Sequence, residues 1–219
     1  IEQAEKAFDR VAERTPVVAS LKPGGRFVAT DIYEAGGVAL VARELVKAGL
    51  VFKGWTKRPY RGMVTNSVVV FILRDGNPKK IRTWTDLLKP GVEVVTPNPF
   101  TSGGARWNVM AAYGAWRREG KTDKQAQANL RKLFGNVVVQ DKSARDSLNT
   151  FMSGKGDVLL AYENEALFSK LKGLDVQYVV PRSTILIENP IAVTRTTKHV
   201  KEANAFLKFL TSPAAQQVF

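Results

Sequence analysis

The segment from Thr96 to Trp107, T-P-N-P-F-T-S-G-G-A-R-W, combines residue types that suit the binding of a small anion. A loop with two prolines leads into a helical pattern at Ser102-Gly103-Gly104, where Thr101 or Ser102 can cap the helix. Two glycines let a ligand approach the backbone, because no Cβ stands in the way. The free N–H groups of the first turn and the helix dipole then favour negative charge. The tripeptide alone is more often a plain capped helix start.

A second capped helix start, Ser143-Ala144-Arg145, follows the apolar run Val137–Gln140. Two helix N-termini from one lobe could converge on one dianion, with neutral N–H and O–H donors and no countercharge. Many donors must act together, because desolvating a dianion costs far more than one hydrogen bond returns. We interpret Arg106 and Arg145, which lie just inside the two helix starts, as structural charges.

Composition limits the classes of protein that the chain can represent. No cysteine is present among 219 residues, which excludes disulfides, thiol nucleophiles and cysteine-ligated zinc or iron–sulfur sites. A formal charge of +13 attracts anions, but no basic run is interleaved with aromatics as a nucleic-acid groove requires. No run reaches the roughly 18 apolar residues of a membrane span, and Ile1 opens directly into a helical pattern without an export signal. We expect a soluble protein without metal or cofactor.

Hydrophobic periodicity predicts an α/β chain with a mostly parallel sheet covered on both faces. The expected helices are Glu2–Glu13, Gly37–Lys47, Gly104–Arg118, Asp123–Phe134, Ala144–Met152, Glu163–Lys172 and Lys198–Leu210. The expected strands are Val17–Leu21, Arg26–Asp31, Ser67–Leu73, Val92–Val95, Val137–Gln140, Val158–Ala161, Val176–Val180 and Ile185–Val193.

Two long strand patterns end in turn residues and suggest crossings between lobes, near residues 74–78 and 185–190. The predicted first lobe contains residues 1–75 and 188–219. Residues 76–187 form the predicted second lobe, which carries the anion-binding motifs. A ligand would then bind in the cleft between the lobes.

From about residue 48 to residue 219 the chain resembles the sulfate- and thiosulfate-binding proteins of bacterial ABC importers. The resemblance rests on three segments in the family's order: GMVTNSVVVFILRDGNPKKIRTWTDLLKPGVEVVTPNPFTSGGARWN, NVVVQDKSARDSLNTF and GDVLLAYENEAL. It implies a two-lobed fold like that of the type II periplasmic binding proteins. It also implies a monomeric receptor in the periplasm or elsewhere outside the cytoplasm, with a tetrahedral oxyanion and a membrane permease as partners.

The resemblance also implies a set of ligand-binding residues, namely Ser102, Gly103, Gly104, Ala144 and Tyr162. The family often has tryptophan at the last of these positions. Tyrosine keeps an aromatic wall and replaces the N–H donor with an O–H donor.

The resemblance fails in residues 9–50, where the two first-lobe motifs of the family that supply oxyanion donors are not present. This segment, DRVAERTPVVASLKPGGRFVATDIYEAGGVALVARELVKAGL, resembles the dihydroxy-acid and sugar-acid dehydratases instead. The chain therefore looks like a splice, either an engineered chimera or a composite sequence, and a natural fusion is the least favoured of the three explanations. At the other end, Phe219 is expected to stop inside the family's last helix. Residues 1–50 are expected to form a helix, two strands and a helix that restore a core without binding the ligand.

Three functions follow from these patterns. The first is a solute receptor. The second, a dehydratase-related fragment, is expected to lack catalysis because no cysteine can hold the family's iron–sulfur cluster. His199, the pair Asp141 and Arg145 and the pair Glu163 and Glu165 show no nucleophile–base arrangement and are expected to be ordinary surface and cap charges. In the third, the chain folds but binds no anion tightly, because the first-lobe donors are missing and the acids at positions 31–34 repel a dianion.

Overall fold

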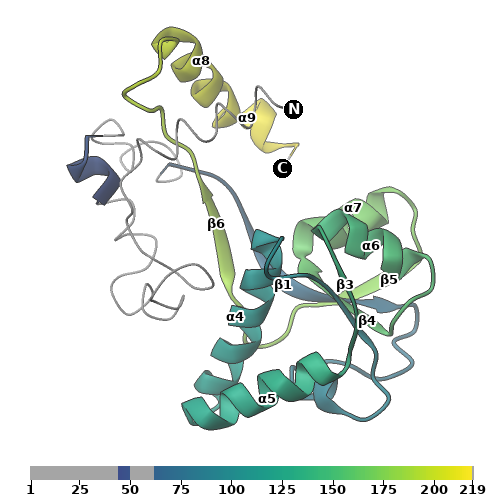
Figure 1. Cartoon of the computed structure of the whole chain (residues 1–219). Coiled ribbons are helices and arrows are strands. Elements are labelled where there is room, and N and C mark those ends of the chain that lie inside the picture. Colours follow the sequence, from purple (N-terminus) through teal and green to yellow (C-terminus); the bar gives the residue numbers. More distant parts are fainter. Residues whose placement is uncertain (1–43, 50–61, 219) are drawn as a thin grey trace. The chain divides into compact units, whose positions relative to one another are not determined.

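The computed structural model describes residues 44–49 and 62–218 (Figure 1). Residues 44–47 are helical, and the rest of the predicted helix Gly37–Lys47 lies outside the described residues. The same holds for the predicted helix Glu2–Glu13 and the strands Val17–Leu21 and Arg26–Asp31. The expected helix–strand–strand–helix arrangement of residues 1–50 therefore stays a prediction.

The chain separates into two compact units. Residues 66–188 form the central unit, and residues 1–65 with 189–219 form the terminal unit. Both divisions fall inside strands that pair with each other, β1 (Met63–Arg74) and β6 (Leu186–Pro190). The first division thus comes before the turn cluster at residues 74–78, where the sequence suggested a crossing. That turn belongs to the central unit, in which Arg74 donates to the carbonyl oxygens of Lys155 and Gly156. That two lobes close on a ligand stays a prediction.

The sheet has the strand order β3-β2-β4-β1-β5, with β6 paired to β1. The remaining strands are β2 (Val94–Pro97), β3 (Val137–Asp141), β4 (Val158–Tyr162) and β5 (Val176–Val179). Strand β2 pairs in parallel with both β3 and β4. Strand β1 is antiparallel to both β4 and β5, so the sheet is mixed and the expectation of a mostly parallel sheet was wrong. A strand buried on both faces reads as a continuous apolar run in either direction, so its sequence does not reveal its orientation.

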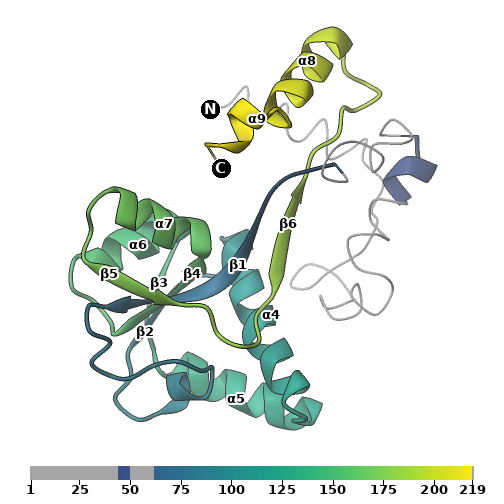
Figure 2. The same cartoon turned by 180° about the vertical axis from the view of Figure 1, so that it is seen from behind.

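Helices cover both faces of the sheet in the central unit, as predicted (Figures 1 and 2). One face packs against α4 (Gly103–Arg118) and α5 (Asp123–Gly135), and the other against α6 (Ala144–Met152) and α7 (Glu163–Leu171). The side chains of β1 alternate between the two cores, as the period of a strand requires. Phe71 lies in the core with Trp84 and Trp116, and Ile72 in the core with Leu148 and Phe151.

Three of these helices begin at side-chain caps, of which Ser102 and Ser143 were predicted from the sequence. The side-chain oxygens of Ser102, Thr122 and Ser143 accept the N–H groups of Ala105, Gln125 and Asp146, respectively. A short 3-10 helix, η3 (Asp86–Leu88), also lies in the central unit. The terminal unit contains α8 (Val200–Leu210) and a short α9 (Pro213–Gln216). The sequence patterns predicted neither η3 nor α9, each of which has at most four residues.

Gly156 lies just before β4, where Val95 of β2 and the backbone of Glu93 leave no room for a side chain. Its φ is +72°, and a Cβ there would come within 2.7 Å of Val95 Cγ2 and 3.3 Å of the Glu93 carbonyl oxygen. Gly91 has the same φ of +72° with no atom within 4 Å of its Cβ position. Alanine at position 91 would therefore introduce the backbone strain of this φ without a steric clash. We expect Gly156→Ala to lower the free energy of unfolding by about 1–3 kcal/mol more than Gly91→Ala, measured by urea denaturation. Equal losses in the two variants would contradict this packing argument.

Candidate anion-binding site

Three helix starts lie at one edge of the central sheet. Because β2 is parallel to β3 and to β4, the carboxyl ends of the three strands meet at the same edge. Each strand leads into a helix within a few residues: β2 into α4, β3 into α6 and β4 into α7. Ser102, Ala144 and Tyr162 occupy these three connections. The topology thus brings the five predicted ligand residues to one edge of one unit.

The connection from β2 to α4 is organised by Asn98. Its carbonyl oxygen accepts the N–H groups of Thr101 and Ser102 at 3.1 and 2.9 Å. Ser102 is buried, and its Oγ accepts the Ala105 N–H at 3.4 Å. The N–H groups of Gly103 and Gly104 have no intrahelical acceptor, as in the first turn of any α-helix. They are the backbone donors that this helix start offers to an anion.

Gly104 faces two hydroxyl groups. A Cβ on Gly104 would lie 3.6 Å from Ser102 Oγ and 3.7 Å from the Tyr162 hydroxyl oxygen. Tyr162, the last residue of β4, is half-buried, and burial raises the pKa of its hydroxyl to about 12. The phenol is therefore protonated at neutral pH and can donate a hydrogen bond. The space that a side chain of Gly104 would fill is thus bordered by the hydroxyl groups of Ser102 and Tyr162.

The second helix start is tied to the first by loop contacts. The Asn98 N–H donates to the Asp141 carbonyl oxygen at 2.7 Å, and Thr101 Oγ1 donates to the Lys142 carbonyl oxygen at 2.9 Å. Ala144 is the first residue of α6, and Ser143 Oγ already accepts the Asp146 N–H. The Ala144 N–H is left without an intrahelical acceptor, as the sequence predicted. The role of Thr101 as a link between the loops was missed, since it depends on a contact 41 residues away along the chain.

The arginines near the two helix starts contact the protein. Arg106 Nε donates to the Pro99 carbonyl oxygen at 2.9 Å. Arg145 forms an ion pair with Glu165 at 3.2 Å, and its guanidinium lies 4.1 Å from the centre of the Phe168 ring. These contacts agree with the expected structural role of both arginines.

The charge pairs considered in the sequence are arranged differently in the structure. Asp141 was considered as the partner of Arg145, but Arg145 pairs with Glu165 instead. Asp141 Oδ1 accepts a hydrogen bond from the Thr150 hydroxyl at 3.0 Å. The carboxylate of Glu163 accepts the Tyr178 hydroxyl at 3.3 Å. His199 is an exposed residue at the start of α8, as expected. Among the described residues, no three His, Asp or Glu side chains are grouped so that they could hold a metal ion.

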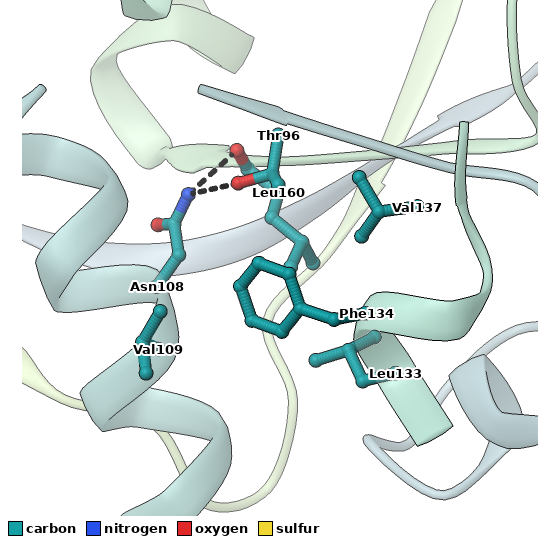
Figure 3. Close-up of a pocket in the computed structure, with 7 residues that line it drawn as sticks. All are labelled: Thr96, Asn108, Val109, Leu133, Phe134, Val137 and Leu160. Atoms are coloured by element: carbon teal, nitrogen blue, oxygen red, sulfur yellow. Dashed lines mark hydrogen bonds between the residues drawn. The ribbon is translucent and has the colours of Figure 1, made fainter. Parts of the chain in front are cut away.

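Asn108 connects α4 to the sheet behind the site. Its buried amide nitrogen donates to the Leu160 carbonyl oxygen at 2.9 Å and to Thr96 Oγ1 at 3.2 Å (Figure 3). Leu133, Phe134 and four other residues complete the lining of a cavity of about 10 Å³ next to this amide. A cavity of that volume holds about one water molecule and no larger ligand. Asn108 therefore positions α4. This role was not predicted, because the residue lies inside a helical pattern and its partners are distant in the sequence.

The relatives of the chain indicate its class. Residues 9–219 match the family model of the bacterial extracellular solute-binding proteins. The chain belongs to this family. The sulfate-binding protein of Synechococcus elongatus is 46% identical over 198 residues, which are 86% of this chain and 57% of that protein. The thiosulfate-binding protein of Pseudomonas aeruginosa is 39% identical over 78% of this chain and 54% of that protein.

The solved structure of the sulfate-binding protein SubI from Mycobacterium tuberculosis H37Rv resembles this chain with a TM-score of 0.70 and 42% identity. The match covers 82% of this chain and 63% of SubI. It confirms the predicted fold of a periplasmic binding protein. These relatives are binding proteins, which agrees with the expectation that the chain is not an enzyme. The chain spans little more than half the length of the curated relatives that it matches.

A dehydratase also matches part of the chain. The dihydroxy-acid dehydratase of Koribacter versatilis is 52% identical over 44 residues, which are 20% of this chain and 8% of the enzyme. This match agrees with the resemblance seen in residues 9–50. The family model of the solute-binding proteins begins at residue 9 and so includes the same segment. The splice between two families stays a prediction. In the described part of the chain, no helix has the length and apolar character needed to span a membrane.

Removing the link between the two loops should loosen the start of α4. In Thr101→Val the Lys142 carbonyl loses its hydrogen bond, which contributes about 1 kcal/mol. We expect the Thr101 and Ser102 amides to exchange with deuterium about fivefold faster, as monitored by NMR. Thr101→Ser keeps the hydroxyl and should exchange as the unchanged protein does. Equal exchange in the valine and serine variants would show that the hydrogen bond does not hold the loop.

Proposed function

We propose that this chain is the oxyanion-binding part of a receptor that delivers sulfate or thiosulfate to an ABC importer. The observation that carries the proposal is the arrangement of Ser102 Oγ and the Tyr162 hydroxyl around the unoccupied Cβ position of Gly104, at the N-terminus of a helix. The sulfate- and thiosulfate-binding relatives support the same ligand class.

The ligand would be held by neutral dipoles. The N–H groups of Gly103, Gly104 and Ala144 donate from two helix N-termini, where the dipoles favour a dianion. The hydroxyls of Ser102 and Tyr162 supply two further donors. Because Arg106 and Arg145 are engaged with Pro99 and Glu165, no guanidinium near these starts needs to pair with the ligand.

The family supports a proposal for the compartment and the partners. We propose a periplasmic or other extracytoplasmic location, a monomer, and a membrane permease of an ABC importer as the partner. The formal charge of +13 would raise the rate at which anions approach the surface. Nucleic acid is a less suitable partner, because the basic residues are scattered through the sequence and often lie beside acids.

A second candidate is a chain that folds but binds no anion tightly. It is favoured by the 44-residue match to a dehydratase, because residues 9–50 lack the family's first-lobe donors. Each lost hydrogen bond to the anion removes about 1.5–3 kcal/mol of binding free energy. Asp31 and Glu34 in the substituted segment would also repel a dianion. Calorimetric titration with sulfate at low salt separates the candidates, since the second requires weak or undetectable binding.

A methyl group at Gly104 should block the ligand without harming the fold. The Cβ of Gly104→Ala would lie 3.6 Å or more from other protein atoms, in ordinary van der Waals contact. Gly114→Ala is the matched control on the same helix, with no atom within 4 Å of its Cβ position. We expect neither variant to be less stable in urea, because alanine favours the helix by about 1 kcal/mol. Sulfate affinity should fall at least about tenfold in Gly104→Ala alone. Unchanged affinity would place the ligand elsewhere.

Loss of the Ser102 hydroxyl should weaken binding by one hydrogen bond. We expect Ser102→Ala to lower sulfate affinity by about 1–2 kcal/mol, roughly 5- to 30-fold. The variant also loses the cap of α4, so Thr122→Ala, which removes the cap of α5, is the control for stability. Both variants should unfold at a lower urea concentration than the unchanged protein, and only Ser102→Ala should bind sulfate less tightly. The same affinity in both variants would exclude Ser102 as a ligand.

A further inference from the structure

A surface of exposed basic side chains lies where α4 passes into α5 in the central unit (Figures 1 and 2). It contains the last turn of α4, the turn that follows and the outer side of α5. Its six cations are all exposed: Arg117, Arg118, Lys121, Lys124, Arg131 and Lys132. We call this surface the α4–α5 basic face. None of the six forms an ion pair within the part of the chain that the structure describes.

The outer side of α5 is defined by the residues that this helix buries. Ala126 and Leu133 pack into the core that α5 shares with α4. At about 100° of rotation per residue, Lys124 and Arg131 lie on one side of the helix, opposite the two buried residues. These two cations are therefore carried on the side of α5 that faces away from the core.

Helix stability accounts for only part of this charge. The two arginines in the last turn of α4 lie where the helix dipole favours cations. Lys124 lies in the first turn of α5, where the dipole disfavours a cation. Residues 117–132 contain six basic and two acidic side chains, a net charge of +4. The acids are Glu119 and Asp123, and the second of them accepts a side-chain amide of α5 instead of pairing with a cation.

We propose that the α4–α5 basic face binds the surface of a membrane that contains anionic lipids. Clusters of about four to eight basic residues on a helical surface are typical of such contacts, because the phosphates of a negative leaflet attract each cation. The six cations of this face fall within that range. The contact would hold the protein at the membrane by charge, without the insertion of an apolar segment.

The composition of the face favours lipid over other anionic partners. A nucleic-acid groove uses exposed aromatic side chains on which bases stack, whereas Trp116 is buried and Tyr113 and Phe134 are half-buried. A protein partner is held mainly by aromatic or apolar anchors, and between residues 108 and 137 no large apolar side chain is exposed. Lipid headgroups can rearrange around fixed charges and need neither kind of anchor.

The α4–α5 basic face is separate from the proposed anion site. Gly103 begins α4 and Arg118 ends it, and these 16 residues of helix span about 24 Å. A contact with lipid at the end of α4 leaves the start of that helix free. The inference therefore goes beyond the proposed function and does not depend on sulfate binding.

Two pairs of charge reversals test the inference with the same change in net charge. Lys124→Glu with Arg131→Glu alters the α4–α5 basic face. Lys170→Glu with Lys172→Glu is the matched control, because these exposed lysines lie at the end of α7, on the other face of the sheet. Binding is measured by co-sedimentation with vesicles of phosphatidylcholine that contain roughly 40% phosphatidylglycerol, and with vesicles of phosphatidylcholine alone. Urea unfolding checks that each variant is folded.

We expect the unchanged protein to bind the anionic vesicles but not the neutral ones, and to bind more weakly as salt rises from about 0.02 to about 0.15 M. The pair of substitutions in α5 should reduce binding to anionic vesicles at least about tenfold, because two attractive charges become repulsive. The pair in α7 should change it about threefold or less. If the α5 variant does not fold, Arg118→Glu with Lys121→Glu alters the same face and should show the same loss.

Three results would overturn the inference. The first is an unchanged protein that does not bind anionic vesicles at low salt, and binding of duplex DNA in their place would identify nucleic acid as the partner. The second is an equal loss in the α5 and α7 variants, which would mean that net charge alone attracts the lipid. The third is equal binding to neutral vesicles. Sulfate titration of the same proteins is a separate measurement, and failure to bind sulfate would overturn the proposed function alone.

Discussion

The parallel pairing of β2 with both of its neighbours is the constraint on which the rest of the site depends. If β2 ran antiparallel to β3 or β4, Ser102 would leave the sheet at the edge opposite Ala144 or Tyr162. The pairing is continued beyond the strands by the hydrogen bond from the Asn98 N–H to the Asp141 carbonyl oxygen. Asn108 then connects α4 to the carbonyl of Leu160 on β4. The geometry of the donors is therefore fixed by backbone bonds and one buried amide.

Two glycines of the central unit are required for different reasons. At Gly156 the protein itself excludes a side chain, because a Cβ would come within 2.7 Å of Val95 Cγ2. At Gly104 the protein imposes no such limit, and helix propensity favours alanine at this position. A glycine that neither packing nor backbone conformation requires, placed beside two hydroxyl groups, agrees with the proposed approach of a ligand to the backbone.

Local chemistry made much of this structure predictable from the sequence. The caps Ser102 and Ser143 are visible as Ser before a helical pattern, because a cap is a contact between residues three positions apart. The Glu165 partner of Arg145 lies 20 residues away, and the orientation of β1 depends on its pairing with β4 and β5. Nothing within one segment specifies such contacts. The ligand residues were predicted from the family resemblance, and the parallel strands place them at one edge of the sheet.

The net charge and the site act at different ranges. A charge of +13 on the chain produces a field that salt screens over roughly 10 Å, so it affects the approach of an anion more than its final contacts. Near the site, guanidinium groups are held by the protein: Arg106 by the Pro99 carbonyl and Arg145 by Glu165 and Phe168. Fixed N–H and O–H dipoles recognise shape and protonation, whereas a mobile cation would attract any anion. With the arginines engaged elsewhere, the contacts to an anion in the proposed site would be left to the neutral groups around Gly104.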